Sequence, residues 1–404
     1  MQSSTVVRTK PAAGVALTLG LCFVVALLEG LDLQSIGVAA PRMAREFGLS
    51  VSQMGLAFGA GTFGLLPGAI LGGRLADRIG RKRVLIMATA LFGIFSIGTA
   101  HAWDFWSLVA IRVATGMGLG GAMPNLIAIC SEAVPARLRN TAVSIMYCGI
   151  PLGGAIAAVI GIVSAGETGW RHIFYVGGLG PLLVVPMLLM LPEPRRFDGP
   201  EGNFVKPPSV AWALFAERRA AATCCLWISY FFTLIVLYFL LNWLPSLMVA
   251  NGLTRAQAGV VQIIFNIGGS AGALGIGMLM DRGHPRAVVS GMYVGIIVAL
   301  ATMAAASGMA WTAFGAFLAG LFVTGAQSVL YALGAAYYPM AVRGTGVGAA
   351  VAVGRLGAIA GPMLAGQLLA MGKNASTIIG ASIPITIISA IAALLLLQRP
   401  AERD

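Results

Sequence analysis

Charged side chains are scarce in this sequence: they make up 10% of its 404 residues, whereas a soluble domain carries about 25%. Apolar residues account for 58%, and the mean hydropathy is +0.89. A chain this poor in charge cannot cover a surface that faces water, so the composition predicts an integral membrane protein. The formal net charge is +12, but the cations are too scattered to form a face that follows nucleic-acid phosphates.

Cysteine and the common catalytic motifs are also scarce or missing. The five cysteines all lie within apolar runs and lack metal-ligand spacing, which predicts small buried side chains rather than disulfides or a metal site. No hydrolytic triad, phosphate-binding loop or Walker-type motif is found, which argues against an enzyme and an ATP-driven pump, and no cofactor is expected. The glycines from Gly116 to Gly120 lie within an apolar run with no strand before them, and they predict close helix packing.

Long apolar runs predict twelve helices, since about 20 apolar residues are needed to cross a bilayer. These spans lie near 14–40, 53–76, 84–102, 105–131, 140–165, 172–192, 220–250, 255–280, 287–307, 311–338, 344–371 and 377–397. The first run is too long for a signal-peptide core, so it is expected to be retained. We predict an all-α membrane protein in which a linker at 193–219 joins two six-helix bundles, 1–192 and 220–404.

Lysine and arginine are distributed unevenly between the predicted loops. Nineteen fall on the side that holds both termini, five fall on the other side, and Arg112 and Arg355 lie inside spans. The five are Arg42, Arg45, Arg171, Arg255 and Lys373. Because basic residues are enriched in cytoplasmic loops, we expect both termini in the cytoplasm and the chain in the inner membrane.

Two loop signatures recur at an offset of 204 residues. Gly73, Leu75, Asp77 and Arg78 recur as Gly277, Leu279, Asp281 and Arg282, and Pro135, Arg139 and Thr141 recur as Pro339, Arg343 and Thr345. This recurrence predicts a duplicated six-helix unit. Parallel repeats of this kind are a transporter architecture, with the binding site near the midplane between the two halves.

The loop after the second span, Gly73-Arg-Leu-Ala-Asp77-Arg78-Ile-Gly80-Arg81-Lys82-Arg83, resembles the signature of the major facilitator superfamily. Segments Arg112 to Gly120 and Ser131 to Arg139 resemble two further motifs of that superfamily, and the resemblance covers essentially the whole chain. It implies two pseudo-symmetric bundles, a rocker-switch mechanism and a monomer. It also implies a gating latch that holds the outward-facing state, formed by Asp77, Arg78, Arg81, Glu132 and Arg139 and, in a degraded second copy, by Asp281 and Arg282. A basic loop that only sets the topology is the alternative.

The first span contains Leu28-Glu29-Gly30-Leu31-Asp32-Leu33-Gln34, which resembles the acid-Gly-x-Asp motif of the aromatic acid:proton symporters, with Glu29 where most have Asp. The Glu version, with Tyr147, Gln327 to Tyr331 and Ala352 to Gly357, is similar to the 3-(3-hydroxyphenyl)propionate transporters. The resemblance implies import of a hydroxylated aromatic acid for catabolism. A proton-driven exporter of drugs or metabolites and a facilitator without proton coupling are the alternatives.

Glu29 and Asp32 are the only acids within predicted spans. A charge at the bilayer centre costs about 2.5–3.5 kcal/mol on insertion scales, so the two are expected to face the bundle interior, on one side of their helix. At 1.5 Å per residue, Asp32 and Arg112 lie at similar depths and can meet. Our hypothesis is that Glu29 is the main coupling proton site and that Asp32 and Arg112 form a gated ion pair. A purely structural pairing with Arg112 is the alternative.

Arg355 lies near the predicted midplane in a half whose spans contain no acid. A guanidinium can bind a carboxylate through two hydrogen bonds, so Arg355 is predicted to hold the substrate's carboxylate. Pairing with Glu29 or Asp32 across the halves is the alternative. An aromatic acid also needs a flat apolar slot with a few hydrogen-bonding groups. The candidates are Tyr147, Tyr230, Asn266, Gln327 and Tyr331, unless these side chains only join helices.

Overall fold

The computed structural model of the chain describes residues 12–135, 138–164, 166–191, 209–216, 219–280, 284–339 and 342–399. Almost all of these residues are helical, and twelve helices among them are long and apolar enough to cross a membrane. The prediction of an all-α membrane protein with twelve spans is therefore confirmed.

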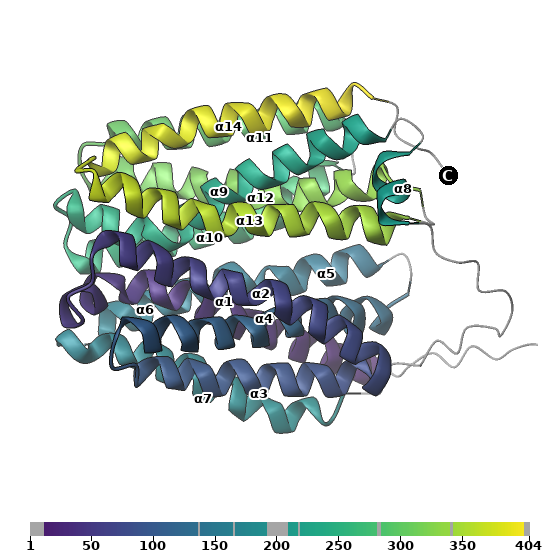
Figure 1. Cartoon of the computed structure of the whole chain (residues 1–404), viewed down its shortest axis with the longest axis horizontal. Helices are drawn as coiled ribbons and strands as arrows, with labels where there is room; N and C mark the ends of the chain where they lie inside the picture. Colours follow the sequence, from purple (N-terminus) through teal and green to yellow (C-terminus); the bar gives the residue numbers. More distant parts are fainter. Residues whose placement is uncertain are drawn as a thin grey trace, which may run out of the picture.

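The helices form two bundles, which Figure 1 shows one above the other. The first holds α1 (Ala12–Glu46), α2 (Val51–Ile79), α3 (Arg81–Ala100), α4 (Phe105–Ala133), α5 (Arg139–Tyr147), α6 (Gly149–Val163), the 3-10 turn η2 (Glu167–Gly169) and α7 (Trp170–Leu188). The second holds α9 (Ala220–Ala250), α10 (Arg255–Met280), α11 (Pro285–Ala305), α12 (Met309–Ala336), α13 (Arg343–Ala370) and α14 (Ala375–Leu397). The predicted linker falls largely outside the described residues, and its described part contains the short α8 (Val210–Phe215).

The internal repeat is visible in where the helices begin. Helices α2 and α10, α3 and α11, α4 and α12, and α5 and α13 start at Val51 and Arg255, Arg81 and Pro285, Phe105 and Met309, and Arg139 and Arg343. The members of each pair begin 204 residues apart, which is the offset of the loop signatures. In each half the matching helices also pack together, α2 along α4 and α10 along α12.

Glycine lets α2 and α4 approach to backbone contact. A Cβ atom placed on Gly116 would lie 2.0 Å from the carbonyl oxygen of Gly61, and one on Gly120 would lie 2.2 Å from that of Leu65. No larger residue fits at either position without moving the helices apart. The glycine spacing in the fourth span therefore serves helix packing, as predicted.

Two spans differ locally from the prediction. Helix α1 continues past Pro41 to Glu46, six residues beyond the predicted end, so Arg42 and Arg45 lie on its last turns rather than in a loop. The fifth span is interrupted at Cys148 between α5 and α6. Pro151 explains the interruption, because it has no N–H to donate to the carbonyl four residues earlier in the helix.

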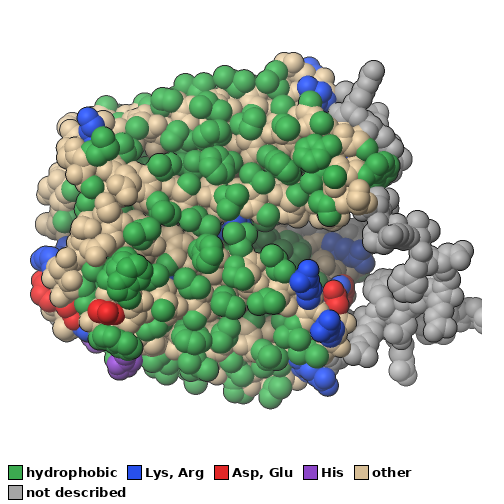
Figure 2. Space-filling view, in the orientation of Figure 1, with side chains coloured by type: hydrophobic (Ala, Val, Ile, Leu, Met, Phe, Trp, Pro, Cys, Tyr) green, Lys and Arg blue, Asp and Glu red, His purple; other side chains and the backbone are tan. Residues whose placement is uncertain are grey.

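The two ends of the molecule differ. We call the end at which α1 begins and α14 ends the terminal end, and the opposite end the far end. On the face shown in Figure 2, hydrophobic side chains cover the middle of the surface and most charged ones gather toward the two ends, as expected of a protein embedded in lipid. A hollow between the halves is visible in Figure 2, on the side toward the terminal end.

Candidate functional site

A cavity of about 300 Å³ lies between the two bundles, within the size range of sites for small molecules. Its wall is mostly apolar and includes one acid and one cation, Glu29 and Arg355. The other polar side chains that line it are Gln34, Ser144, Tyr147, Tyr238, Asn266, Thr324, Gln327, Ser328 and Tyr331. Among the described residues, no group of three or more His, Cys, Asp or Glu side chains is placed to hold a metal ion.

Glu29 reaches the cavity from the middle of α1. Its side chain is 2% exposed, and its Oε2 atom is buried without a hydrogen-bond partner among the residues that the structure describes. The structure thus places a group that can gain and lose a proton directly in the cavity wall.

Arg355 enters the same cavity from α13 in the other half. Its Nη1 atom donates a hydrogen bond to the hydroxyl of Tyr238 at 2.5 Å, and its guanidinium carbon lies 6.0 Å from the centre of that ring. In the part of the chain that the structure describes, Arg355 forms no ion pair with Glu29 or Asp32, although Glu29 shares the cavity. The guanidinium is therefore positioned by a neutral partner and keeps further donors for an anion.

Aromatic side chains from both halves form one side of the cavity. Tyr147 and Tyr331 face each other at 6.4 Å between ring centres, and Tyr238 completes the group. Tyr230, which the sequence put among the substrate contacts, does not line the cavity: it is 1% exposed, and its ring lies behind Tyr331 at 5.8 Å. Tyr238, eight residues later on the same helix, occupies the wall instead, which the sequence analysis missed.

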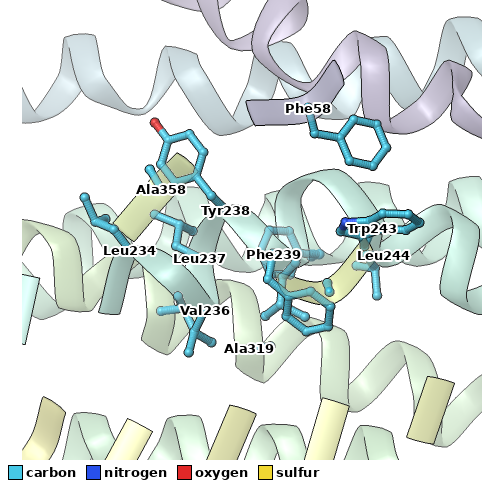
Figure 3. Close-up of a cluster of buried hydrophobic side chains, with 14 of the residues drawn as sticks. Phe58, Leu234, Val236, Leu237, Tyr238, Phe239, Trp243, Leu244, Ala319 and Ala358 are labelled. Atoms are coloured by element: carbon cyan, nitrogen blue, oxygen red, sulfur yellow. The ribbon is translucent and has the colours of Figure 1, made fainter. Parts of the chain in front are cut away.

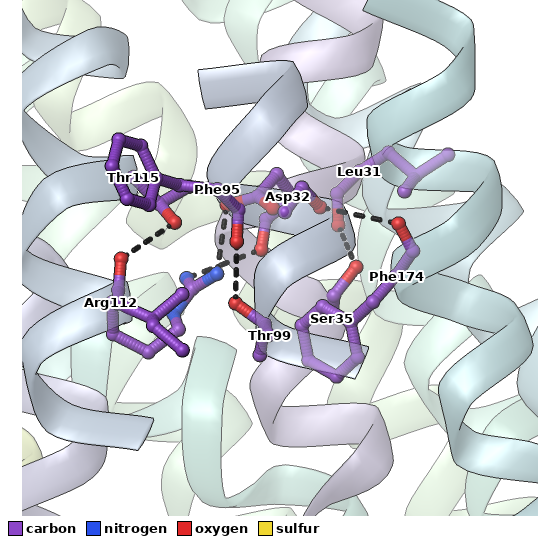
Figure 4. Close-up of polar contacts among 10 residues, drawn as sticks. Leu31, Asp32, Ser35, Phe95, Thr99, Arg112, Thr115 and Phe174 are labelled. Carbon is purple, nitrogen blue, oxygen red and sulfur yellow. Dashed lines mark hydrogen bonds and ion pairs between the residues drawn. The ribbon is translucent and has the colours of Figure 1, made fainter. Parts of the chain in front are cut away.

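The buried ion pair expected between the first and fourth spans is present. Arg112 Nη1 donates to Asp32 Oδ2 at 2.9 Å, and both side chains are at most 2% exposed (Figure 4). The guanidinium also lies 6.0 Å from the centre of the Phe174 ring. Asp32 Oδ1 and Arg112 Nε are buried without partners, so the pair is held by one short contact and a longer one to the Asp32 carbonyl, 3.4 Å.

Three amide side chains join the halves at the inner wall of the cavity. Gln34 of α1 exchanges two hydrogen bonds with Asn266 of α10, at 2.9 and 2.8 Å, and also accepts one from Gln262 at 2.7 Å. Asn266 was predicted to contact substrate, and it does line the cavity, but its amide is already bonded across the halves. Gln34 appears in the first-span motif, yet no role was predicted for it or for Gln262.

Beyond these amides, the halves are in close contact toward the far end. Phe58 of α2 meets Trp243 of α9 edge to face at 4.9 Å (Figure 3). A Cβ atom placed on Gly37 would lie 2.7 Å from the carbonyl oxygen of Asn242, so α1 and α9 touch backbone to backbone. The cavity is therefore closed at the far end and open at the terminal end.

The predicted latch residues lie at the terminal end. Arg81, at the start of α3, is paired with Glu132 near the end of α4. Asp77 and Arg139 are exposed, and so is Arg78. Asp281 and Arg282 of the second copy fall outside the described residues. One ion pair of the predicted latch is thus formed, and the gating role of the group stays a prediction.

Comparison with known proteins gives consistent matches. The profile of the Major Facilitator Superfamily matches residues 22–253 and 226–404. The chain is 49% identical to the 3-(3-hydroxy-phenyl)propionate transporter of Escherichia coli (strain K12), over 98% of this chain and 97% of that protein. It is 34% identical to the 4-hydroxybenzoate transporter PcaK of Pseudomonas aeruginosa and 35% identical to the gallate transporter of Pseudomonas putida, each over 88% of this chain and 86% of the relative.

Solved structures share the fold at lower sequence identity. A bacterial homolog of the human lysosomal transporter Spinster, in an inward-facing and unoccupied conformation, superimposes with a TM-score of 0.78 at 19% identity, over 96% of this chain and 98% of that one. The xylose transporter XylE from E. coli, in an inward open conformation, gives 0.74 at 19% identity, over 95% and 96% of the two chains. These likenesses concern the fold alone.

The Asp32–Arg112 pair leads to a prediction about stability. Arg112→Gln leaves the Asp32 carboxylate buried without a counter-charge, and breaking a buried pair in this way costs about 3–5 kcal/mol. The double variant Asp32→Asn/Arg112→Gln removes both charges and is expected to unfold at a higher temperature than Arg112→Gln alone. Thermal unfolding of the purified protein in detergent measures this. If the loss in the double variant equals the sum of the losses in Asp32→Asn and Arg112→Gln, the two side chains do not depend on each other.

Proposed function

The chain belongs to the Major Facilitator Superfamily and is a transporter rather than an enzyme, and on that premise we propose that it imports an aromatic carboxylate together with protons. We name 3-(3-hydroxyphenyl)propionate or a related hydroxylated aromatic acid as substrate. The observation that carries the proposal is the cavity in which a buried acid, Glu29, and a guanidinium without an acidic partner, Arg355, share a wall with aromatic rings. The 49% identical relative, a 3-(3-hydroxy-phenyl)propionate transporter, supports this choice of substrate.

The two charged groups of the cavity are suited to different tasks. Arg355 would bind the carboxylate of the substrate, and the rings of Tyr147, Tyr238 and Tyr331 would pack against its aromatic ring. Glu29, on the opposite half, would carry the proton, with Asp32 and Arg112 as an ion pair that opens during the cycle. Because proton site and anion site lie on different halves of one cavity, both would be exposed to the same side at once.

Alternating access would follow from rocking of the halves about this cavity. The cations of the turn between α2 and α3 support an orientation with the terminal end in the cytoplasm of the inner membrane, as the positive-inside rule expects. In that orientation the cavity is open inward, with Asp77 exposed and Arg81 paired with Glu132 at its cytoplasmic end. Closure of the terminal end and opening of the far end would give the outward-facing state.

Purified protein in liposomes tests the proposal as a whole. With the outside more acidic than the inside, we expect accumulation of 3-(3-hydroxyphenyl)propionate, loss of accumulation with an uncoupler, and no uptake of the corresponding amide, which lacks the carboxylate. 4-Hydroxybenzoate and gallate serve as comparison substrates. Net flux toward the acidic side would favour the exporter, and uptake indifferent to the uncoupler would favour a facilitator without protons.

Glu29 provides a sharper prediction about coupling. Glu29→Gln cannot release a proton, so we expect uphill accumulation to be lost, whereas exchange of labelled for unlabelled substrate continues. Glu29→Asp keeps a carboxyl group and is the matched control, which should retain accumulation driven by the pH gradient. Accumulation by Glu29→Gln with full dependence on the gradient would assign proton coupling to another group.

Arg355 provides a prediction about binding. Arg355→Ala removes charge-assisted hydrogen bonds, and the loss of a single one, worth about 1.5–3 kcal/mol, would lower substrate affinity roughly 10- to 150-fold. Tyr238→Phe keeps the guanidinium and the ring but removes the hydroxyl partner, and a smaller loss is expected. Equilibrium binding of labelled substrate to the purified variants measures both effects. Unchanged affinity in Arg355→Ala would mean that the carboxylate binds elsewhere.

A further inference from the structure

Three of the five cations assigned to the far side meet where the two halves touch. Arg42 and Arg45 come from the last turns of α1, and Arg255 is the first residue of α10. One carboxylate serves this group: Glu167 accepts from Arg255 at 3.0 Å and lies 3.3 Å from Arg45. The neighbouring acid Glu46 is bound to Arg171 and Trp170 in the first half. The junction thus carries more positive than negative charge.

A small cavity lies between the halves at this junction, and we call it the seam cavity. Its volume is about 30 Å³, which is space for one group the size of a water molecule. Arg42 and Arg255 line it from opposite halves, and no acid is among its lining residues. The rest of the wall is apolar or backbone, from Pro41, Ile162 and Pro245 among others.

Arg42 is incompletely paired at this position. One of its terminal nitrogens donates to the carbonyl of Ser164 at 2.9 Å, but its Nε atom is buried without a partner within the described residues. Glu167 is bound to Arg255 and Arg45, so one carboxylate faces three guanidinium groups at the junction, and the remaining positive charge favours a further anion beside Arg42. The seam cavity therefore has the charge, the donors and the size of a site for a small anion.

We propose that the seam cavity is an anion-binding site, in which Arg42 and Arg255 hold one small ion of the size of chloride between the two halves. The first turn of α10 adds to the attraction, because Ala258 and Gly259 line the cavity near the positive end of the helix dipole. An anion held by both halves stabilises the form that is closed at the far end. Opening of the far end separates Arg42 from Arg255 and releases the ion.

The site goes beyond the proposed function, since it acts on the closed far end and not on the central cavity. It would exist whatever compound is carried. It nevertheless has a consequence for transport: release of the ion on opening leaves an excess of positive charge from Arg42, Arg45 and Arg255 at the outer mouth. These groups then attract anions from that side, which raises the rate at which anionic compounds arrive.

Thermal unfolding of the purified full-length protein tests the site. Sodium chloride and sodium acetate are compared with sodium gluconate, whose anion is too large for the seam cavity, at constant ionic strength. For a dissociation constant near 10 mM, 100 mM of a bound anion should raise the melting temperature on the order of 2 °C in a saturable manner. Arg42→Gln and Arg255→Gln should abolish the rise. Lys373→Gln, which removes an exposed cation of the same end, should retain it.

Each outcome bears on the proposal. A rise with chloride alone assigns the site to inorganic anions, and a rise with acetate as well extends it to carboxylates. Arg42→Lys keeps the charge but has fewer donors, and it should show a smaller rise. A partial rise in Arg42→Lys would show that the loss in the glutamine variants comes from the missing site and not from a general folding defect. No saturable rise with either anion, or an equal rise in wild type, Arg42→Gln and Arg255→Gln, would overturn the proposal.

Discussion

A charged group inside a bilayer needs a counter-charge or water within the protein, and the arrangement of this transporter follows from that requirement. Asp32 and Arg112 meet it by pairing with each other in the first half. Glu29 and Arg355 do not pair, and both instead line the central cavity. The cavity is thus the place where the described part of the molecule holds an acid and a cation that are not paired with each other, and under the proposed function an anionic solute and a proton would both enter there.

Features that depend on hydropathy and helical rise along single spans could be predicted from the sequence. Twelve spans follow from hydropathy, and the meeting of Asp32 with Arg112 follows from counting helical rise along two spans. The choice between Tyr230 and Tyr238 could not be made in this way. Helix α9 is buried on nearly all sides, so its residues show no polar face that would reveal which side meets the cavity.

The role of the cations at the far end could not be predicted from the sequence either. In the sequence, Arg42 and Arg255 count only as exceptions to the positive-inside rule, because they lie 213 positions apart. Their proximity depends on how the first bundle rests against the second, which no local pattern encodes. The amide contacts of Gln34 and Asn266 arise from the same packing. The contacts that join the two halves therefore required the structure.

The common offset of the helix starts has a consequence for how the two halves divide their work. The position equivalent to Glu29 in the second half is Thr233, which is hydrogen-bonded to Tyr293 and Ser389 in a neutral cluster. Helices α9 to α14 contain no acidic residue at all. Duplication has thus preserved the scaffold while the chemistry diverged: the first copy keeps acids in its interior, whereas the helices of the second contain none and contribute the cation Arg355 to the central cavity.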